Sequence, residues 1–133
     1  MPPISFVHWS LLIAAMMPYA VVLVSKANRD YDNADPRNLD KIRTPLRRRG
    51  YDAHQNCFEA FPFFAVAVLL AEFHGGPQRL VNELAILFLI VRIAYVLTYL
   101  GDRPTLRSIL RSIGFAINLA IFFMPVIRNH LPI

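Results

Sequence analysis

The stretch that decides the fold runs from Asp52 to Phe73 and reads DAHQNCFEAFPFFAVAVLLAEF. Its second half is almost wholly apolar, and the whole stretch has about the 20 residues that a helix needs to cross a bilayer. Its first half carries Asn56 and Glu59 among apolar neighbours. An ionisable group inside a membrane is costly, so it usually faces a bundle interior, an opposite charge or a ligand. Glu59 therefore predicts a polar site within a membrane helix.

The whole chain of 133 residues is 56% hydrophobic. Outside residues 52–73 it contains three more apolar blocks of similar length. Short links after the second and third blocks make consecutive helices antiparallel neighbours. The sequence thus predicts one all-α domain over residues 1–133, an integral membrane four-helix bundle without a separate soluble domain. The expected helices cover about 4–25, 52–73, 79–100 and 106–127.

Basic residues are distributed unevenly between the two ends of this bundle. Most lie in the long loop 26–51, and the short link between the third and fourth helices adds Arg103 and Arg107. Because cytoplasmic loops of membrane proteins are enriched in Lys and Arg, both connections are expected to be cytoplasmic and both termini periplasmic or lumenal. The net charge of +5 then reflects topology and anionic lipid headgroups, and we expect no nucleic-acid partner.

Metal and disulfide chemistry find no support in the pattern. Cys57 is the only cysteine, so an intrachain disulfide is impossible, and the four histidines are isolated along the chain. These spacings match no metal-binding motif, and we expect no metal site.

The polar residues within the apolar blocks fall on shared helix faces. Asn56 and Glu59 are three residues apart, and Arg92, Tyr95 and Tyr99 follow the spacing i, i+3, i+7. An unpaired guanidinium in the middle of a membrane span is improbable. Antiparallel helices also bring Glu59 and Arg92 to the same depth, so we expect the two side chains to approach each other or to share a ligand.

Two interpretations of this pattern remain open at this point. The polar side chains could form a buried network that only fixes the register of the helices. They could instead line a polar cavity, open to the cytoplasm, for an anionic ligand beside a lipid-soluble one. Arginine suits the second use because its guanidinium binds carboxylates in bidentate fashion.

Three segments resemble the MAPEG family, the membrane-associated proteins of eicosanoid and glutathione metabolism. Asn56–Pro62 (NCFEAFP) is similar to the Asn-x-x-Glu-x-x-Pro signature of its second helix, and Arg92–Tyr99 (RIAYVLTY) to its third-helix Arg-x-x-Tyr-x-x-x-Tyr. Leu106–Ser108 (LRS) resembles the start of its fourth helix. The three segments occur in the family's order, and the residues around Glu59 resemble its bacterial branch more than the mammalian synthases.

The resemblance implies a homotrimer in a bacterial inner membrane, with glutathione bound between neighbouring subunits near the cytoplasmic face. Carried over by position, Asn56 and Glu59 would hold the polar backbone of glutathione. Arg92 and the two tyrosines, Tyr95 and Tyr99, would hold its carboxylates and peptide groups.

The resemblance also implies a reaction. Arg107 would approach the sulfur of glutathione and favour its thiolate, which is the nucleophile. A lipophilic electrophile would enter from the bilayer, so the expected activity is that of a glutathione-dependent transferase or peroxidase.

Two other functions are left open. One is a MAPEG-fold protein without catalysis that binds membrane lipid or another anionic small molecule. It is favoured by Asp52, which stands where characterised members carry an arginine. The other is a small proton-coupled exporter, which is disfavoured because such proteins carry their glutamate in the first helix, and because an arginine beside Glu59 would hinder proton exchange.

Overall fold

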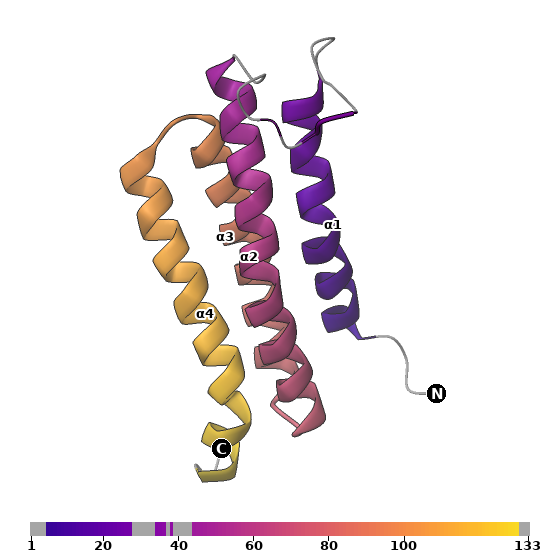
Figure 1. The fold of residues 1–133 in the computed structure, drawn as a ribbon. Coiled ribbons are helices and arrows are strands. Elements are labelled where there is room, and N and C mark those ends of the chain that lie inside the picture. The colour runs from indigo at the N-terminus through magenta and orange to yellow at the C-terminus, as the bar shows by residue number, and fades with distance from the viewer. Residues whose placement is uncertain (1–4, 28–33, 37, 39–43, 131–133) are drawn as a thin grey trace.

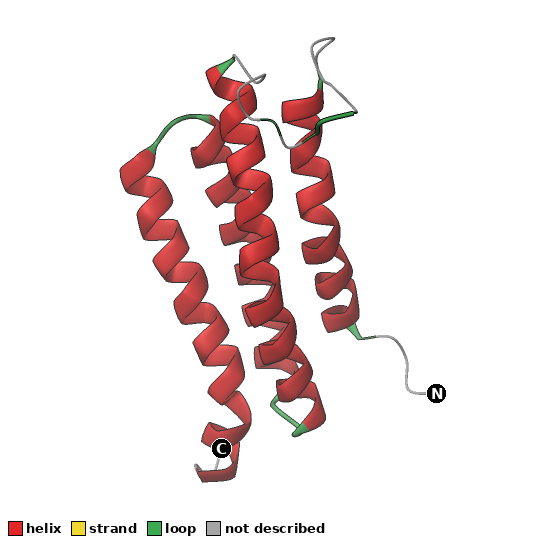
Figure 2. Ribbon diagram, viewed as in Figure 1, coloured by secondary structure: helices red, strands yellow, loops and turns green. Residues whose placement is uncertain are grey.

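The computed structural model describes residues 5–27, 34–36, 38 and 44–130. These contain four helices, each long and apolar enough to cross a membrane, joined by loops (Figures 1 and 2). The all-α prediction is confirmed. The helices are α1 (Phe6–Lys26), α2 (Pro45–Phe73), α3 (Gln78–Leu100) and α4 (Pro104–His130).

The helices form an antiparallel bundle with α2 near its middle (Figure 1). The first helix, α1, packs on α2 and α3, while α4 packs on α3 and α2. The start of α1 and the end of α4 lie at one end of the bundle, and the α3–α4 link lies at the other, beside the start of α2. The arginine-rich turn at the start of α2 and Arg103 of the link therefore share one end, as the sequence predicts.

The boundary of the second helix differs from the prediction. The expected loop 26–51 ends earlier than anticipated, because α2 begins at Pro45 and residues 45–51 are helical. The physical reason is local: Thr44 is extended at the N-cap, proline is favoured in the first helical turn, and arginine is a good helix former. The fourth helix is likewise longer than residues 106–127, since it begins at Pro104 and ends at His130.

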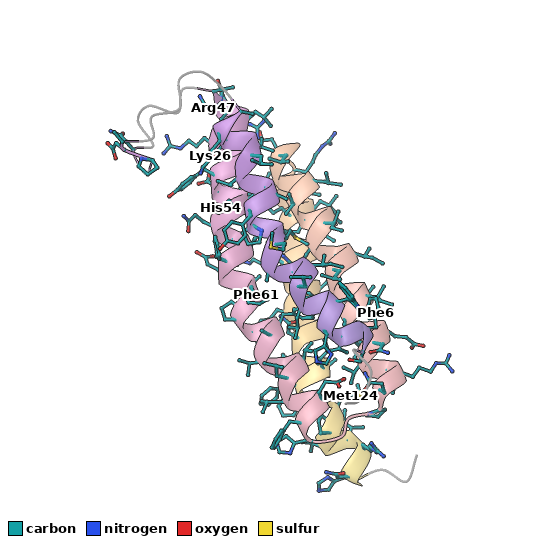
Figure 3. The ribbon with its side chains drawn as sticks, turned by 90° about the vertical axis from the view of Figure 1, so that its right-hand side faces the viewer. Phe6, Lys26, Arg47, His54, Phe61 and Met124 are labelled. Atoms are coloured by element: carbon teal, nitrogen blue, oxygen red, sulfur yellow. The ribbon has the colours of Figure 1, made fainter. Side chains whose placement is uncertain are left out.

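The added turns of α2 fasten the ends of two neighbouring helices. Arg47 is buried, and its Nε donates to the carbonyl of Ser25 at 2.8 Å, near the end of α1. Arg49 Nε donates to the carbonyl of Leu100, the last residue of α3, at 3.1 Å. The last carbonyls of a helix lack partners within it, so these arginines satisfy groups that would otherwise be left free. Figure 3 shows Arg47 at this end of the bundle, with Lys26 below it.

The core below these contacts is packed through aromatic and small residues. Phe64 and Phe88 are almost fully buried and stack with ring centroids 4.1 Å apart. Fully buried alanines on α2 and α3 (Ala67, Ala71 and Ala85) allow the helix backbones to approach closely. This tight contact holds α2 and α3 in register and so fixes the level at which their polar side chains meet.

Candidate functional site

A pocket of about 290 Å³ lies between α2, α3 and α4. Its wall combines charged, amide and aromatic side chains within segments that are long and apolar enough to span a membrane. Two arginines and one glutamate leave an excess of one positive charge, which favours an anionic ligand. The lining residues are Asn56, Glu59, Ala60, Phe63, Phe88, Arg92, Arg111, Gly114, Phe115 and Asn118.

Asn56 connects the two charged residues that the sequence singled out. Arg92 Nη2 donates to Asn56 Oδ1 at 3.2 Å, and Asn56 Nδ2 donates to Glu59 Oε2 at 3.5 Å. Glu59 and Arg92 line the same pocket but form no direct ion pair. Of the two expected arrangements, close approach or a shared ligand, the shared ligand stays a prediction. Asn56 lies between the two charged groups. It accepts a hydrogen bond from the buried guanidinium of Arg92, while the carboxylate of Glu59, one turn further along α2, is exposed.

Arg92 is a buried cation, and the side chains around it explain how the bundle accommodates its charge. It is only 5% exposed, and its Nη2 also contacts Cys57 Sγ at 3.6 Å. Its guanidinium carbon lies 4.4 Å from the centroid of the Tyr95 ring, which is cation–π geometry. A buried charge is costly unless it is hydrogen-bonded and paired. The amide of Asn56, the thiol of Cys57 and the ring of Tyr95 provide hydrogen-bonding and cation–π contacts to this guanidinium in place of an ion pair.

Tyr95, Tyr99 and Arg107, the remaining predicted residues, contact one another in a row that we call the stack. The rings of Tyr95 and Tyr99 lie 5.8 Å apart in an edge-to-face arrangement. The guanidinium carbon of Arg107 on α4 lies 4.2 Å from the centroid of Tyr99. Neither tyrosine lines the pocket, and neither does Arg107. The six predicted residues therefore form one chain of contacts from α2 through α3 to α4, of which the first three line the pocket.

The family assignment rests on the whole bundle. The MAPEG family model matches residues 6–127, which include all of the pocket and the stack. The chain belongs to the MAPEG family. No curated protein and no solved structure matches it.

The structure of this MAPEG protein adds site residues that the sequence reasoning missed, above all Arg111 and Asn118 on α4. Together with Arg107 and Gly114 they have the spacing of one helix face, at intervals of four, three and four residues. This periodicity was a usable signal, because it places polar residues on the same face as a predicted site residue. Asn118 is 4% exposed, and its Oδ1 is buried without a hydrogen-bond partner.

Two arginines that precede Asn56 in this MAPEG protein, Arg47 and Arg49, contact other helices. Asp52, which replaces the arginine expected from the family resemblance, does not line the pocket. Arg47 and Arg49 donate to the ends of α1 and α3 and so are committed to helix termini. The cations within the pocket come from α3 and α4 instead.

A metal site has no support in the part of the chain that the structure describes. Within it, no group of three or more His, Cys, Asp or Glu side chains could hold a metal ion. Cys57, the one cysteine of the chain, contacts Arg92 rather than a second thiol or a histidine.

Proposed function

We propose that this MAPEG protein binds glutathione in the α2–α3–α4 pocket and uses it to attack lipophilic electrophiles, as a transferase or peroxidase. The observation that carries this proposal is the Asn56–Arg92 hydrogen bond at the wall of a pocket with excess positive charge. Glutathione carries two carboxylates, one ammonium group and two peptide groups. A site for it needs cations, a carboxylate and amide partners together.

The pocket residues match these groups by charge. Glu59 is exposed on the pocket wall and suits the ammonium group of glutathione. Arg92 and Arg111 suit its carboxylates, since guanidinium groups bind carboxylates with paired hydrogen bonds. Asn56 offers an amide for a peptide group. This assignment adds Arg111 to the residues expected from the sequence and keeps Tyr95 and Tyr99 as supports that hold Arg92 and Arg107 in place.

In the proposed reaction Arg107 stabilises the thiolate of glutathione. Its guanidinium remains protonated in proteins, so it acts as a fixed positive charge and not as a base. The thiol proton passes to solvent, the thiolate forms a bond to the electrophilic atom, and the leaving group departs with the electron pair of the bond that breaks. The Tyr99 ring fixes the guanidinium by cation–π contact, which keeps this charge in position.

The proposed assembly is a homotrimer in a bacterial inner membrane, with the loop before α2 and the α3–α4 link in the cytoplasm and both termini in the periplasm. The clustering of basic residues at the end that carries Arg47–Arg49 and Arg103 supports this orientation. Exposed pocket residues, including Glu59, Arg111 and Phe115, support an assembly in which a neighbouring subunit covers them. Light scattering of the detergent-solubilised protein measures the number of chains directly.

A second candidate function is binding without catalysis, with membrane lipid or another anionic small molecule as the ligand. Two observations favour it. Asp52 reverses the charge expected at its position, and Arg107 does not line the pocket. A non-catalytic protein would bind an anion in the pocket but would not lower the pKa of a bound thiol.

Calorimetric titration of the purified protein with glutathione tests the proposed site. We expect saturable binding that is weakened about tenfold in Glu59→Gln, because a charge-assisted hydrogen bond to the ammonium group is lost. Glu83→Gln is the matched control, since Glu83 pairs with Arg79 on the exposed start of α3, away from the pocket. Equal affinities in the two variants would contradict the assignment of Glu59.

A further inference from the structure

Asn118 has a buried side-chain oxygen, Oδ1, for which the described part of the chain provides no hydrogen-bond partner. The residue is 4% exposed, lines the pocket from α4, and its Oδ1 is buried without a hydrogen-bond partner. Water is absent from the hydrocarbon region of a bilayer, so a polar group at such a position must find a partner in protein or ligand. The missing partner of Oδ1 is a hydrogen-bond donor.

The pocket around Asn118 is aromatic. Phe63, Phe88 and Phe115 contribute to its wall, and the rings of Phe63 and Phe115 lie 5.5 Å apart. Gly114 leaves room beside them, because a Cβ at this position would come to 3.9 Å from the Phe88 ring and 3.8 Å from Val91. A flat apolar group fits such a wall better than a charged one.

The charged residues lie toward the other end of the same pocket. Arg111 precedes Asn118 by two helical turns, or about 10 Å along α4. On α3, Arg92 lies one turn beyond Phe88, and on α2 Glu59 lies one turn before Phe63. Because α2 and α4 run antiparallel to α3, the pocket passes from a charged end through the aromatic rings to the lone amide of Asn118.

We propose that Asn118 is a specificity-determining residue that accepts a hydrogen bond from an O–H or N–H group of the second, lipophilic substrate. The substrate class is then an apolar, ring-bearing or flat molecule with one donor group, which lies among the three phenylalanines with its donor at Asn118. This inference rests on the proposed function in assigning the charged end to glutathione and the aromatic end to the electrophile.

A matched pair of probes tests the donor requirement. We would measure the binding of 1-naphthol and of 1-methoxynaphthalene to the full-length protein in phosphatidylcholine–phosphatidylglycerol nanodiscs, with correction for partition into protein-free discs. The two probes share their ring system, but only 1-naphthol can donate a hydrogen bond. We expect about a fivefold preference for 1-naphthol, the size of one net hydrogen bond.

Two leucine variants distinguish the effect of Asn118 from a general effect of an Asn-to-Leu substitution on α4. Asn118→Leu keeps a similar volume without the amide, and it is expected to remove the preference for 1-naphthol. Asn129→Leu, near the end of α4 and outside this pocket, is expected to keep the preference. The ligand-free Asn118→Leu protein is also expected to melt at a temperature equal to or higher than that of the wild type, because the substitution removes an unsatisfied buried oxygen.

Equal binding of the two probes to the wild type, or a preference that survives Asn118→Leu, would overturn the proposal that Asn118 accepts a hydrogen bond from the substrate. A lower melting temperature of ligand-free Asn118→Leu would also overturn it, because the amide would then have a partner in the assembled protein. A preference that depends on Asn118 in a protein that fails to bind glutathione would contradict the proposed function and leave the donor site standing.

Discussion

Asn56 separates Arg92 from Glu59: it accepts from the guanidinium at 3.2 Å and donates to the carboxylate at 3.5 Å. The neutral amide thus joins a buried cation on α3 to an exposed anion on α2. In this arrangement the carboxylate is not consumed by a direct ion pair. Glu59 therefore remains on the pocket wall for a ligand, while the amide of Asn56 accepts a hydrogen bond from the buried guanidinium.

The stability of the bundle should depend on this amide. Asn56→Leu removes an acceptor from the buried guanidinium, and we expect a loss of about 1–3 kcal/mol in the free energy of unfolding. Titration with a denaturing detergent, followed by circular dichroism, measures the loss. Gln55→Leu is the control, because Gln55 is exposed and its amide donates to the hydroxyl of Tyr51 on the same helix. Equal stability of both variants would argue against a structural role for the Asn56–Arg92 bond.

Arg47 should contribute to stability more than its neighbour does. Arg47→Ala removes the donor to Ser25 and leaves a carbonyl at the end of α1 unsatisfied, which should cost about 1.5–3 kcal/mol. Arg48 is exposed, so Arg48→Ala should change stability by less than about 0.5 kcal/mol. The same unfolding titration compares the two. Similar losses would mean that only the overall positive charge of this turn matters.

Two glycines in the bundle should respond to alanine in opposite ways. At Gly50 an added Cβ would lie 3.0 Å from Val24 Cγ1 and 3.3 Å from the backbone nitrogen of Ser25, so Gly50→Ala should force α1 and α2 apart. We expect a loss of about 1–3 kcal/mol from overpacking.

At Gly114 the nearest atoms would be at ordinary contact distance, 3.8 Å or more. Gly114→Ala should therefore be neutral or stabilising by up to about 1 kcal/mol, through higher helix propensity. Thermal melts of the two variants in the same detergent make the comparison. A loss at Gly114 as large as that at Gly50 would contradict the packing described for α3 and α4.

The charge at Asp52 should tune glutathione affinity. Asp52 lies one turn before Asn56 on the same face of α2, so Asp52→Arg places a cation at the entrance to the proposed site. We expect glutathione to bind about two- to fivefold more tightly, as for a partly exposed charge pair. Asp52→Asn removes the negative charge without adding a positive one, so it separates the two effects on glutathione affinity. Calorimetry measures the affinity of both variants. Weaker binding to Asp52→Arg than to Asp52→Asn would show that glutathione does not approach this turn.

The sequence was sufficient for the architecture because long apolar blocks have few alternatives in a bilayer. Spacing on α2 and α3 placed Asn56, Glu59 and Arg92 on facing helices, and the structure brings them to one pocket. The sequence was not sufficient to predict how these three side chains contact one another, because the choice between a direct ion pair and an intervening amide depends on side-chain geometry. The start of α2 was missed because Arg47–Arg49 resemble a solvated basic loop until their partners on α1 and α3 are known.

The fourth helix shows a different limit. Arg107 was selected by resemblance, whereas Arg111 and Asn118 emerge from the pocket lining. Their shared helix face was visible in the sequence, but the direction of that face depends on how α4 packs against α2 and α3. The sequence alone could not set this direction, because α4 has exposed apolar residues on several sides.

The most direct test of the proposed activity is the ultraviolet thiolate absorbance of glutathione on the purified protein, read during a calorimetric titration at neutral pH. We expect saturable binding with a thiolate signal in the wild type. We also expect Arg107→Ala to lose the signal while it keeps its fold and binds glutathione. The absence of binding at millimolar glutathione, or an undiminished thiolate signal in Arg107→Ala, would contradict the proposed activity.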